Sequence, residues 1–492
     1  MKALVHPVIP PRPVTAAQVA AAGATAVESG AAAVEDTIAA LATPSGTSAL
    51  ALIRVCGPAS RKLAADIFHR DAAGLTPRRA CHGLYRATED GRVLDDLVWV
   101  FAAGPATATG EDTLELSCHG NPLIVQLILD DLFKRGCRPA EPGEFTRRAF
   151  LNGKLELTQA EAVMDLIHAR SERALAAAQR QLQGDLGRHL EALIARVLAV
   201  LARIEVYIDF PDEDLPPENR RQVQAELGDV LRGTQRLLAT HRYGDLLRDG
   251  LKTVLLGAPN AGKSSLLNAL VGRERALVSA EPGTTRDFIE ERLQVGAHLL
   301  RLIDTAGVNP APGEIERLGI AKTAERLAEA DLVLWVVDAS AADSPALPPA
   351  FAAYLTPEKT LRVRNKIDLA PAALAGSVAD SAVPCPTLAV SALTGDGMEA
   401  LREAIVALAD GLRPSLFAEE SIAVNARHAD ALRRAQLAFE TALAGLDAAA
   451  PAPIELVSGD LRAGLDALGE IAGRVDNERM LDALFANFCI GK

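Results

Sequence analysis

The chain has 492 residues, of which 49% are apolar and only 4% aromatic, and its formal net charge is −13. This length exceeds what one ordinary core organises and predicts several domains, with helices favoured by the abundant Ala and Leu. The acidic balance argues against bulk, salt-driven nucleic-acid binding, although a local basic patch or an RNA-binding partner stays compatible with it.

The composition favours a cytoplasmic protein. The six cysteines are scattered without a C-x-x-C pair, so we interpret them as free thiols in a reducing compartment rather than as zinc ligands. No apolar run approaches the length of a membrane span. Residues 1–34 are rich in Ala, Pro and Val and make a poor signal peptide, so we expect a disordered extension or a mis-assigned start there.

Residues 35–150 mix strand and helix patterns. Short apolar runs predict strands, and longer amphipathic stretches predict helices. The expected strands are 38–42, 49–55, 93–101 and 113–117, and the expected helices are 58–68 and 122–135. This mixture predicts a small α+β domain.

Residues 151–248 and 413–492 carry helical patterns. From 158 to 207 the sequence has almost no Pro or Gly, and an apolar stripe indicates that helix packs on helix. The stripe consists of Leu166, Leu175, Leu182, Leu186, Leu190, Ile194 and Leu198. Further helices are expected at 219–241, 429–446, 456–471 and 477–488, and the acidic break 210–217 is interpreted as a solvated loop rather than a metal site. The pattern predicts one all-α domain into which residues 249–412 are inserted.

The inserted segment begins with a phosphate-binding signature. An apolar strand at 254–256 runs into Gly-x4-Gly-Lys-Ser at 257–264 and then into a helical pattern at 265–271, which fits a P-loop. The phosphate-binding residues would be Asn260, Ala261, Gly262, Lys263, Ser264 and Ser265. Lys263 should reach the β- and γ-phosphates, and the Ser264 hydroxyl should ligate Mg²⁺.

Two switch-like motifs follow. In the first, Gly283-Thr284-Thr285, a threonine could join Mg²⁺ and the γ-phosphate. The second comes directly after an apolar strand at 299–303 and consists of Asp304, Thr305, Ala306 and Gly307. There Asp304 can hold the Mg²⁺ shell, and the Gly307 N–H can meet the γ-phosphate.

Two further motifs predict the choice of base. Asn365, Lys366 and Asp368 follow a strand, and Ser391-Ala392-Leu393 follow another at 387–390. A carboxylate such as Asp368 accepts from both N1–H and the 2-amino group of guanine, so a site built around that pair selects GTP over ATP. Together the motifs predict a Ras-like, doubly wound guanine-nucleotide domain.

The water-positioning group is not given by the usual motif. Val308 stands where small signalling GTPases carry a glutamine, so either hydrolysis is slow or another group, such as Glu314 or Glu316, orients the water. Arg286 and Arg317 are interpreted as surface ion pairs rather than as arginine fingers. The Asn260 amide oxygen could ligate a monovalent cation in place of an arginine, or Asn260 could be a turn former.

Several segments, the GTPase motifs among them, resemble the MnmE (TrmE) family of tRNA-modification GTPases. They are 257–265, 283–287, 314–320, the N-terminal 142–157 and the terminal Phe-Cys-Ile-Gly-Lys at 488–492, within a match that covers about 35–492. The resemblance implies a multidomain α/β protein. An N-terminal folate-binding and dimerisation domain at 35–150 and a helical domain at 151–248 and 413–492 would carry an inserted potassium-activated P-loop GTPase at 249–412.

The resemblance also implies a reaction and partners. A homodimer would act with MnmG (GidA), a flavoprotein that carries FAD, in a heterotetramer or larger complex. It would add a carboxymethylaminomethyl or aminomethyl group to C5 of the wobble uridine of certain tRNAs. The one-carbon unit would come from 5-formyl- or 5,10-methylene-tetrahydrofolate.

The family's functional residues map onto this chain by motif. Potassium would be held by Asn260 with Ser279, Glu281 and Thr284, within a loop that also contains Ala280, Pro282 and Gly283. Mg²⁺ would be held by Ser264 and Thr285. Glu316 would orient the attacking water, alongside Lys263 and Thr285 at the phosphates. Folate would be held by Arg54, Glu115, Lys154 and Lys492, and Cys489 would be a buried thiol nearby, with a nucleophilic role as a hypothesis.

The alternative is a ribosome-assembly or signalling switch GTPase, whose output is binding rather than covalent chemistry. Such a factor needs an RNA-binding module, often basic, whereas the flanks here are acidic and carry the folate-type segments. A protein that only binds folate would leave the complete GTPase set unexplained.

Overall fold

The computed structural model describes residues 36–209, 220–272, 290–304, 314–341, 347–369, 385–412, 422–446, 452–474, 478–486 and 488–491. The contacts divide the chain into unit 1, Met1–Asn152 with Ala483–Lys492, and unit 2, Gly153–Asp482. The extension predicted at 1–34 lies outside the described residues. Within these described ranges no helix combines the length and the apolar character needed to cross a membrane.

Unit 1 is built on a six-stranded mixed sheet in the order β3-β4-β5-β2-β1-β6. Its strands are β1 (Ile38–Leu41), β2 (Leu50–Cys56), β3 (Ala80–Arg86), β4 (Val93–Ala102), β5 (Thr113–His119) and β6 (Arg138–Pro139). The helical elements are α2 (Ser60–Phe68), η1 (Ala72–Gly74), α3 (Pro122–Lys134) and α4 (Glu144–Leu151). The α+β class is as predicted, whereas β3 and α4 had no prediction.

The two faces of this sheet are covered differently. Residues that alternate along β2, β4 and β5 pack against α2 and α3 in the main core, as period-2 patterning requires. On the opposite face a smaller cluster joins Ile38, Ala40 and Cys56 to Phe145 of α4. Farther along that face the side chains of Leu84 and Val98 are exposed.

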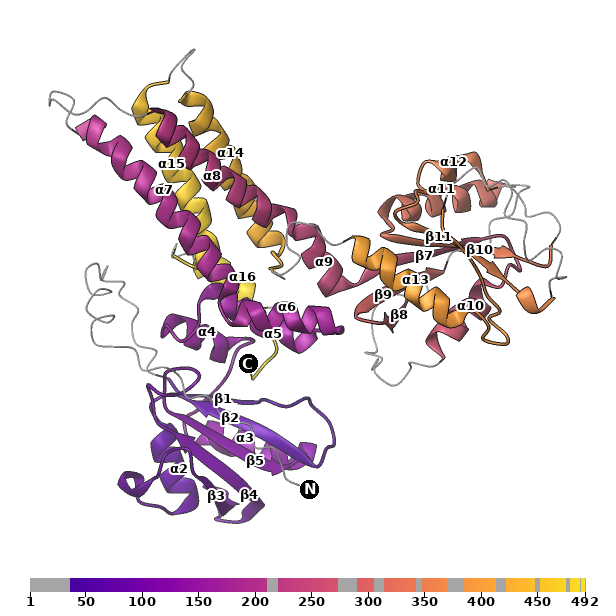
Figure 1. Ribbon diagram of the computed structural model, residues 1–492. Coiled ribbons are helices and arrows are strands. Elements are labelled where there is room, and N and C mark those ends of the chain that lie inside the picture. The colour runs from indigo at the N-terminus through magenta and orange to yellow at the C-terminus, as the bar shows by residue number, and fades with distance from the viewer. Residues whose placement is uncertain are drawn as a thin grey trace, which may run out of the picture. The chain divides into compact units, whose positions relative to one another are not determined.

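The helical part of unit 2 contains α5 (Leu157–His168), α6 (Glu172–Leu182), α7 (Asp185–Asp209), α8 (Arg220–Ala239), α9 (His241–Asp249), α14 (Ala426–Gly445), α15 (Ile454–Ala472) and the first residues of α16 (Glu478–Phe485). Figure 1 shows α7, α8, α14 and α15 as a bundle. Their shared core draws residues from both halves of the interrupted sequence.

The predicted apolar stripe is correct only in part. Leu186, Leu190 and Ile194 are buried in the bundle, but Leu175 and Leu198 are 41% and 45% exposed. The predicted continuous helical stretch is broken between α5 and α6 and again between α6 and α7, so a single helical phase does not run along it. Within α7 the neighbouring Val197, not Leu198, faces the core.

The GTPase part of unit 2 has a second six-stranded sheet in the order β12-β11-β10-β7-β9-β8, in which only β8 pairs antiparallel. The strands are β7 (Leu251–Gly257), β8 (Glu290–Val295), β9 (His298–Asp304), β10 (Leu332–Asp338), β11 (Thr360–Asn365) and β12 (Thr387–Ala389). The helical elements are α10 (Lys263–Val271), α11 (Glu314–Glu329), α12 (Pro349–Ala352), η2 (Ile367–Leu369) and α13 (Met398–Gly411). Helices α10 and α13 cover one face, and α11 and α12 cover the other, which is the doubly wound arrangement (Figure 1).

Candidate nucleotide and ligand sites

The carboxyl ends of β7, β10 and β11 meet at one edge of the GTPase sheet, because these strands are parallel neighbours. The P-loop follows β7. Its lysine, Lys263, is 8% exposed, and the Nζ atom donates to the carbonyls of Gly257 (3.1 Å) and Ala258 (3.0 Å). Ser264 and Ser265 are exposed in the first turn of α10, where helix N–H groups offer an anion site.

Asn365, at the end of β11, joins the P-loop to the last base-recognition loop. It is 1% exposed, its Nδ2 donates to the Ala261 carbonyl (3.3 Å), and its Oδ1 accepts from the Ala392 N–H (3.0 Å). Gly262 has φ +91°, and a Cβ there would lie 2.2 Å from the Asn365 amide nitrogen. The glycine is therefore required both by conformation and by the close approach of Asn365.

Asp368 is held ready for a ligand by a buried serine. The Ser391 hydroxyl donates to Asp368 Oδ1 at 2.6 Å and accepts from the Thr394 N–H at 3.1 Å. Leu393 is 85% exposed beside them. The structure thus brings the P-loop, the Asn365–Asp368 loop and the Ser391 loop together at one edge of the sheet.

Other predicted residues cannot be placed. Outside the described residues lie Ser279, Ala280, Glu281, Pro282, Gly283, Thr284, Thr285, Thr305, Ala306, Gly307 and Lys492. Asp304 and Glu316 belong to β9 and α11, but their side chains are likewise outside the described part. Among described residues, the Ser264 hydroxyl and the Asn260 amide supply oxygen donors of the kind that Mg²⁺ and K⁺ take, so this donor set fits both cations.

In unit 1, Arg54 and Glu115 face each other across β2 and β5. Arg54 Nε and Nη2 both donate to Glu115 Oε1, at 3.1 and 2.9 Å. Arg54 Nη1 also lies 3.4 Å from the Gly491 carbonyl, and the guanidinium sits 5.7 Å from the centre of the Phe145 ring. Lys154 belongs to unit 2 and is exposed.

The C-terminal tail packs onto unit 1 through two glycines. At Gly143 φ is +68°, and a Cβ would lie 2.7 Å from Phe488 Cβ. At Gly491 φ is +91°, and a Cβ would lie 2.3 Å from the Leu41 carbonyl oxygen. Cys489 is exposed, so the expectation of a buried thiol is wrong. Its carbonyl accepts a hydrogen bond from the Gly143 N–H at 3.3 Å.

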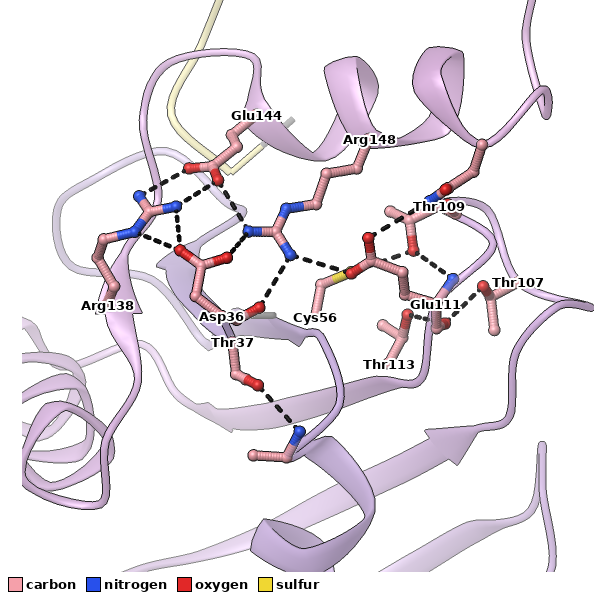
Figure 2. A network of polar contacts seen from close by, with 12 residues as sticks. Asp36, Thr37, Cys56, Thr107, Thr109, Glu111, Thr113, Arg138, Glu144 and Arg148 are labelled. Atoms are coloured by element: carbon pink, nitrogen blue, oxygen red, sulfur yellow. Dashed lines mark hydrogen bonds and ion pairs between the residues drawn. The ribbon is translucent and has the colours of Figure 1, made fainter. Parts of the chain in front are cut away.

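A charged network fixes α4 beside this tail (Figure 2). The Arg148 side chain is 2% exposed and forms ion pairs with Asp36 (2.6 Å), Glu111 (3.0 Å) and Glu144 (2.9 Å). Arg138 bridges Asp36 and Glu144 from β6. Burial acts to raise the pKa of Glu144, but both arginines outweigh it and hold the pKa below its usual value. The network therefore stays ionised at neutral pH and anchors α4, whose Phe145 packs on Arg54.

Cys56 lies at the edge of the same network. Its Sγ is 3.1 Å from Thr109 Oγ1 and 3.3 Å from Glu111 Oε2 (Figure 2). Burial raises the pKa of this thiol to about 12, and the nearby Glu111 carboxylate adds to the effect. A thiol that stays protonated is a poor nucleophile, so Cys56 serves packing and hydrogen bonding.

Sequence reasoning missed three features of these sites. Phe145 and Arg148 lie in the 142–157 segment, but only their contacts show what they do. Asp338 ends β10 and pairs with Lys366 at 2.6 Å. An acidic residue at the carboxyl end of a parallel strand was the one available signal for it.

Comparison with known proteins gives consistent matches over nearly the whole chain. The model of the MnmE helical domain matches residues 157–489, and that of the GTP-binding protein TrmE N-terminus matches residues 37–154. Over 461 residues the chain is 56% identical to the tRNA modification GTPase MnmE of Opitutus terrae, covering 93% of this chain and 99% of that one. The proteins of the same name from Symbiobacterium thermophilum and Akkermansia muciniphila are 43% and 42% identical, with 93% of this chain and 100% and 99% of theirs covered.

Proposed function

This chain belongs to the family of the tRNA modification GTPase MnmE, and from this premise we propose that potassium activates its GTPase in the service of C5 modification of the tRNA wobble uridine. Hydrolysis of GTP to GDP and phosphate is the activity of the family. The observation that carries the proposal is the assembled edge of the GTPase sheet, where Asn365 joins the P-loop to the Ser391 loop.

The described residues have clear roles in binding. Asp368, oriented by Ser391, accepts from guanine N1–H and the 2-amino group, which adenine lacks. Lys263 exchanges the two P-loop carbonyls for β- and γ-phosphate oxygens when the nucleotide enters. In the proposed mechanism Glu316 orients the attacking water, and Thr285 closes over the γ-phosphate.

Two cations complete the site in this proposal. Ser264 and Thr285 would hold Mg²⁺, which neutralises charge on the phosphates. Asn260, with Ser279, Glu281 and Thr284, would hold K⁺, which supplies the positive charge that an arginine finger supplies elsewhere. Val308 cannot orient water by a hydrogen bond, so that separate role falls to Glu316 in this proposal.

The one-carbon chemistry is proposed for the N-terminal domain, residues 35–150. Arg54, Glu115, Lys154 and Lys492 would hold 5-formyl- or 5,10-methylene-tetrahydrofolate, which supplies the one-carbon unit. The Arg54–Glu115 pair supports this, because it offers a carboxylate for a pterin edge and a cation for a glutamate tail.

The proposed assembly is a cytoplasmic homodimer that works on tRNA with the FAD-carrying MnmG (GidA) in a heterotetramer or larger complex. The helical domain, 151–248 and 413–492, would connect the N-terminal domain to the GTPase at 249–412. The exposed apolar side chains of Leu50, Leu84 and Val98 on the unit 1 sheet support dimerisation.

The test is GTP hydrolysis by the full chain in KCl and in NaCl at equal ionic strength. We expect K⁺ to stimulate the wild type roughly tenfold or more, since a correctly placed positive charge stabilises the transition state. Asn260→Ala should lose this stimulation. Asn268→Ala, an exposed amide on α10, is the matched control and should retain it.

Equal rates in the two salts would reduce Asn260 to a turn residue and remove the potassium part of the proposal. The modification part is tested separately, by mass spectrometry of tRNA nucleosides after reaction with the flavoprotein and a tetrahydrofolate. An unmodified wobble uridine in the complete reaction would favour the switch-GTPase alternative.

A further inference from the structure

Asp338 uses both carboxylate oxygens at the end of β10. Oδ1 accepts from the backbone N–H of Ser340 at 2.9 Å and from its hydroxyl at 2.6 Å, while Oδ2 lies 2.6 Å from the Lys366 ammonium. Partial burial acts to raise the pKa of Asp338, but Lys366 and the Ser340 bonds outweigh it and hold the pKa below its usual value. The carboxylate is therefore a fixed anion at neutral pH.

The Lys366 ammonium reaches the P-loop as well. Its Nζ donates to the backbone carbonyl of Asn260 at 2.7 Å. Both residues have a left-handed backbone conformation, with φ of +66° for Lys366 and +63° for Asn260. Such a conformation is uncommon for residues other than glycine and persists where the surrounding contacts impose it. One ion pair and one hydrogen bond thus tie two strained residues from separate loops to the end of β10.

We propose that Asp338 is a positioning residue of the nucleotide site: it holds the Lys366 ammonium on the Asn260 carbonyl and so fixes the peptide that presents the Asn260 amide to a monovalent cation. Without the Asp338 carboxylate, the Lys366 ammonium keeps its three N–H donors but loses the anion that orients it. Water then competes with the Asn260 carbonyl for those donors. Asp338 acts only through Lys366. The inference rests on the proposed potassium site at Asn260.

The experiment measures steady-state GTP hydrolysis by the full chain against GTP and against K⁺ at constant ionic strength. For Asp338→Asn and Asp338→Ala, the KM for GTP and the K⁺ concentration for half-maximal stimulation should both rise roughly three- to tenfold, since the pair is partly exposed. At saturation kcat should stay within about twofold of wild type, because a positioning residue adds nothing to the reacting atoms. Asn matches Asp in size and serves if the Ala variant fails to fold.

Glu329→Gln is the control, because this exposed carboxylate at the end of α11 pairs with Lys252 at 3.2 Å, at the start of β7 and thus at the opposite end of that strand from the P-loop. It should leave both constants unchanged. An Asp338→Asn enzyme with wild-type KM and wild-type K⁺ half-saturation would overturn the inference, as would a loss of kcat with both constants unchanged. If K⁺ fails to stimulate the wild type, the potassium proposal itself fails. The KM for GTP in NaCl then decides alone, and an unchanged value refutes the role of Asp338.

Discussion

In the candidate folate site, Glu115 is a residue whose contact with the ligand can be tested separately from its contact with Arg54. Both bonds from Arg54 end on Oε1. Among the described residues Oε2 has no hydrogen-bond donor, so it can accept from a pterin N–H. We predict that Glu115→Gln weakens binding of 5-formyl-tetrahydrofolate about tenfold to a hundredfold, the range for losing one charge-assisted hydrogen bond. Isothermal titration of the full chain measures it.

The control for this prediction is Glu89→Gln. Glu89 is an exposed carboxylate of unit 1 that pairs with Lys134 of α3 at 2.9 Å. It should leave folate affinity unchanged. Equal affinities of Glu115→Gln and wild type would show that the carboxylate serves only to hold Arg54.

At the scale of residues, the sequence predicted correctly those site residues that lie in the loop directly after a strand. Asn365, Asp368 and Ser391 meet because each follows a strand of one parallel sheet. Asp338 escaped prediction because its partner lies 28 residues away, and no local spacing marks the pair. The exposure of Cys489 escaped for a similar reason, since it depends on how the tail packs against Gly143.

At the scale of elements, helix α5 joins the two segments that flank the inserted GTPase. Its Asp165 forms a bidentate pair with Arg248 near the end of α9, both distances being 2.9 Å. One turn earlier, Glu161 pairs with Arg427 (2.9 Å) and His428 (2.6 Å) in the first turn of α14. The helical domain is thus closed across its long insertion by carboxylates on a single helix.

The buried His428 makes this junction sensitive to acid. Its Nδ1 lies 3.3 Å from the Asn425 N–H, which can only donate, and its Nε2 lies 2.6 Å from the Glu161 carboxylate, which accepts. These contacts define a neutral ring protonated on Nε2. Burial lowers the pKa of His428 and outweighs the opposing pull of Glu161, with the Arg427 and Arg248 cations adding to the decrease.

We predict that the helical domain loses stability as the pH falls below about 6.5. Below that pH His428 is protonated in the unfolded chain but stays neutral in the folded chain. The free energy of unfolding therefore falls by up to about 1.4 kcal/mol for each unit by which the pH is lowered. Thermal unfolding followed by circular dichroism between pH 7.5 and about 5 measures the slope. His428→Gln should flatten it.

His69→Gln is the matched variant, because His69 is an exposed histidine that follows α2 in unit 1. Its pH slope should equal that of wild type. If His428→Gln retained the full wild-type slope, the acid sensitivity would come from other groups.

The sequence predicted the long helices well. It predicted less well which face of each helix is buried and where the edge strands lie. The bundle helices carry enough turns to show their periodicity. Leu175 was misplaced because α6 is a separate helix after α5, and Leu198 because a strict four-residue spacing drifts off the 3.6-residue stripe within α7. Strand β3 is hard to predict from sequence because it is an edge strand. Tyr85 is its one fully buried side chain, so the alternation of buried and exposed residues is weak.

At the scale of the whole molecule, the return of the C-terminal tail to unit 1 could not be derived from local patterns. The tail meets residues more than four hundred positions away, as the Arg54–Gly491 bond shows. Chain-order reading gives adjacent elements but not such closures. The family resemblance pointed to the terminal segment as important. The glycines at 143 and 491 explain physically how this segment packs closely against Leu41 and α4.

The open sheet face of unit 1 predicts how two copies associate. Val98 is 42% exposed and pairs across strands with Ser117 and His82, so these side chains share the face opposite α2 and α3. Leu50 (65% exposed) and Leu84 (41% exposed) extend the apolar surface. Apolar surface of this kind on a folded domain marks an interaction site.

We predict that Val98→Asp raises the dissociation constant of the homodimer roughly tenfold or more, because a buried interface leaves the new charge without a partner. Analytical ultracentrifugation over a concentration series measures it. Leu437→Asp, which places the same charge on an exposed leucine of α14 (66% exposed), should leave the dimer intact. A Val98→Asp chain that dimerises like wild type would place the interface elsewhere, and a monomeric wild type would remove the dimer from the proposal.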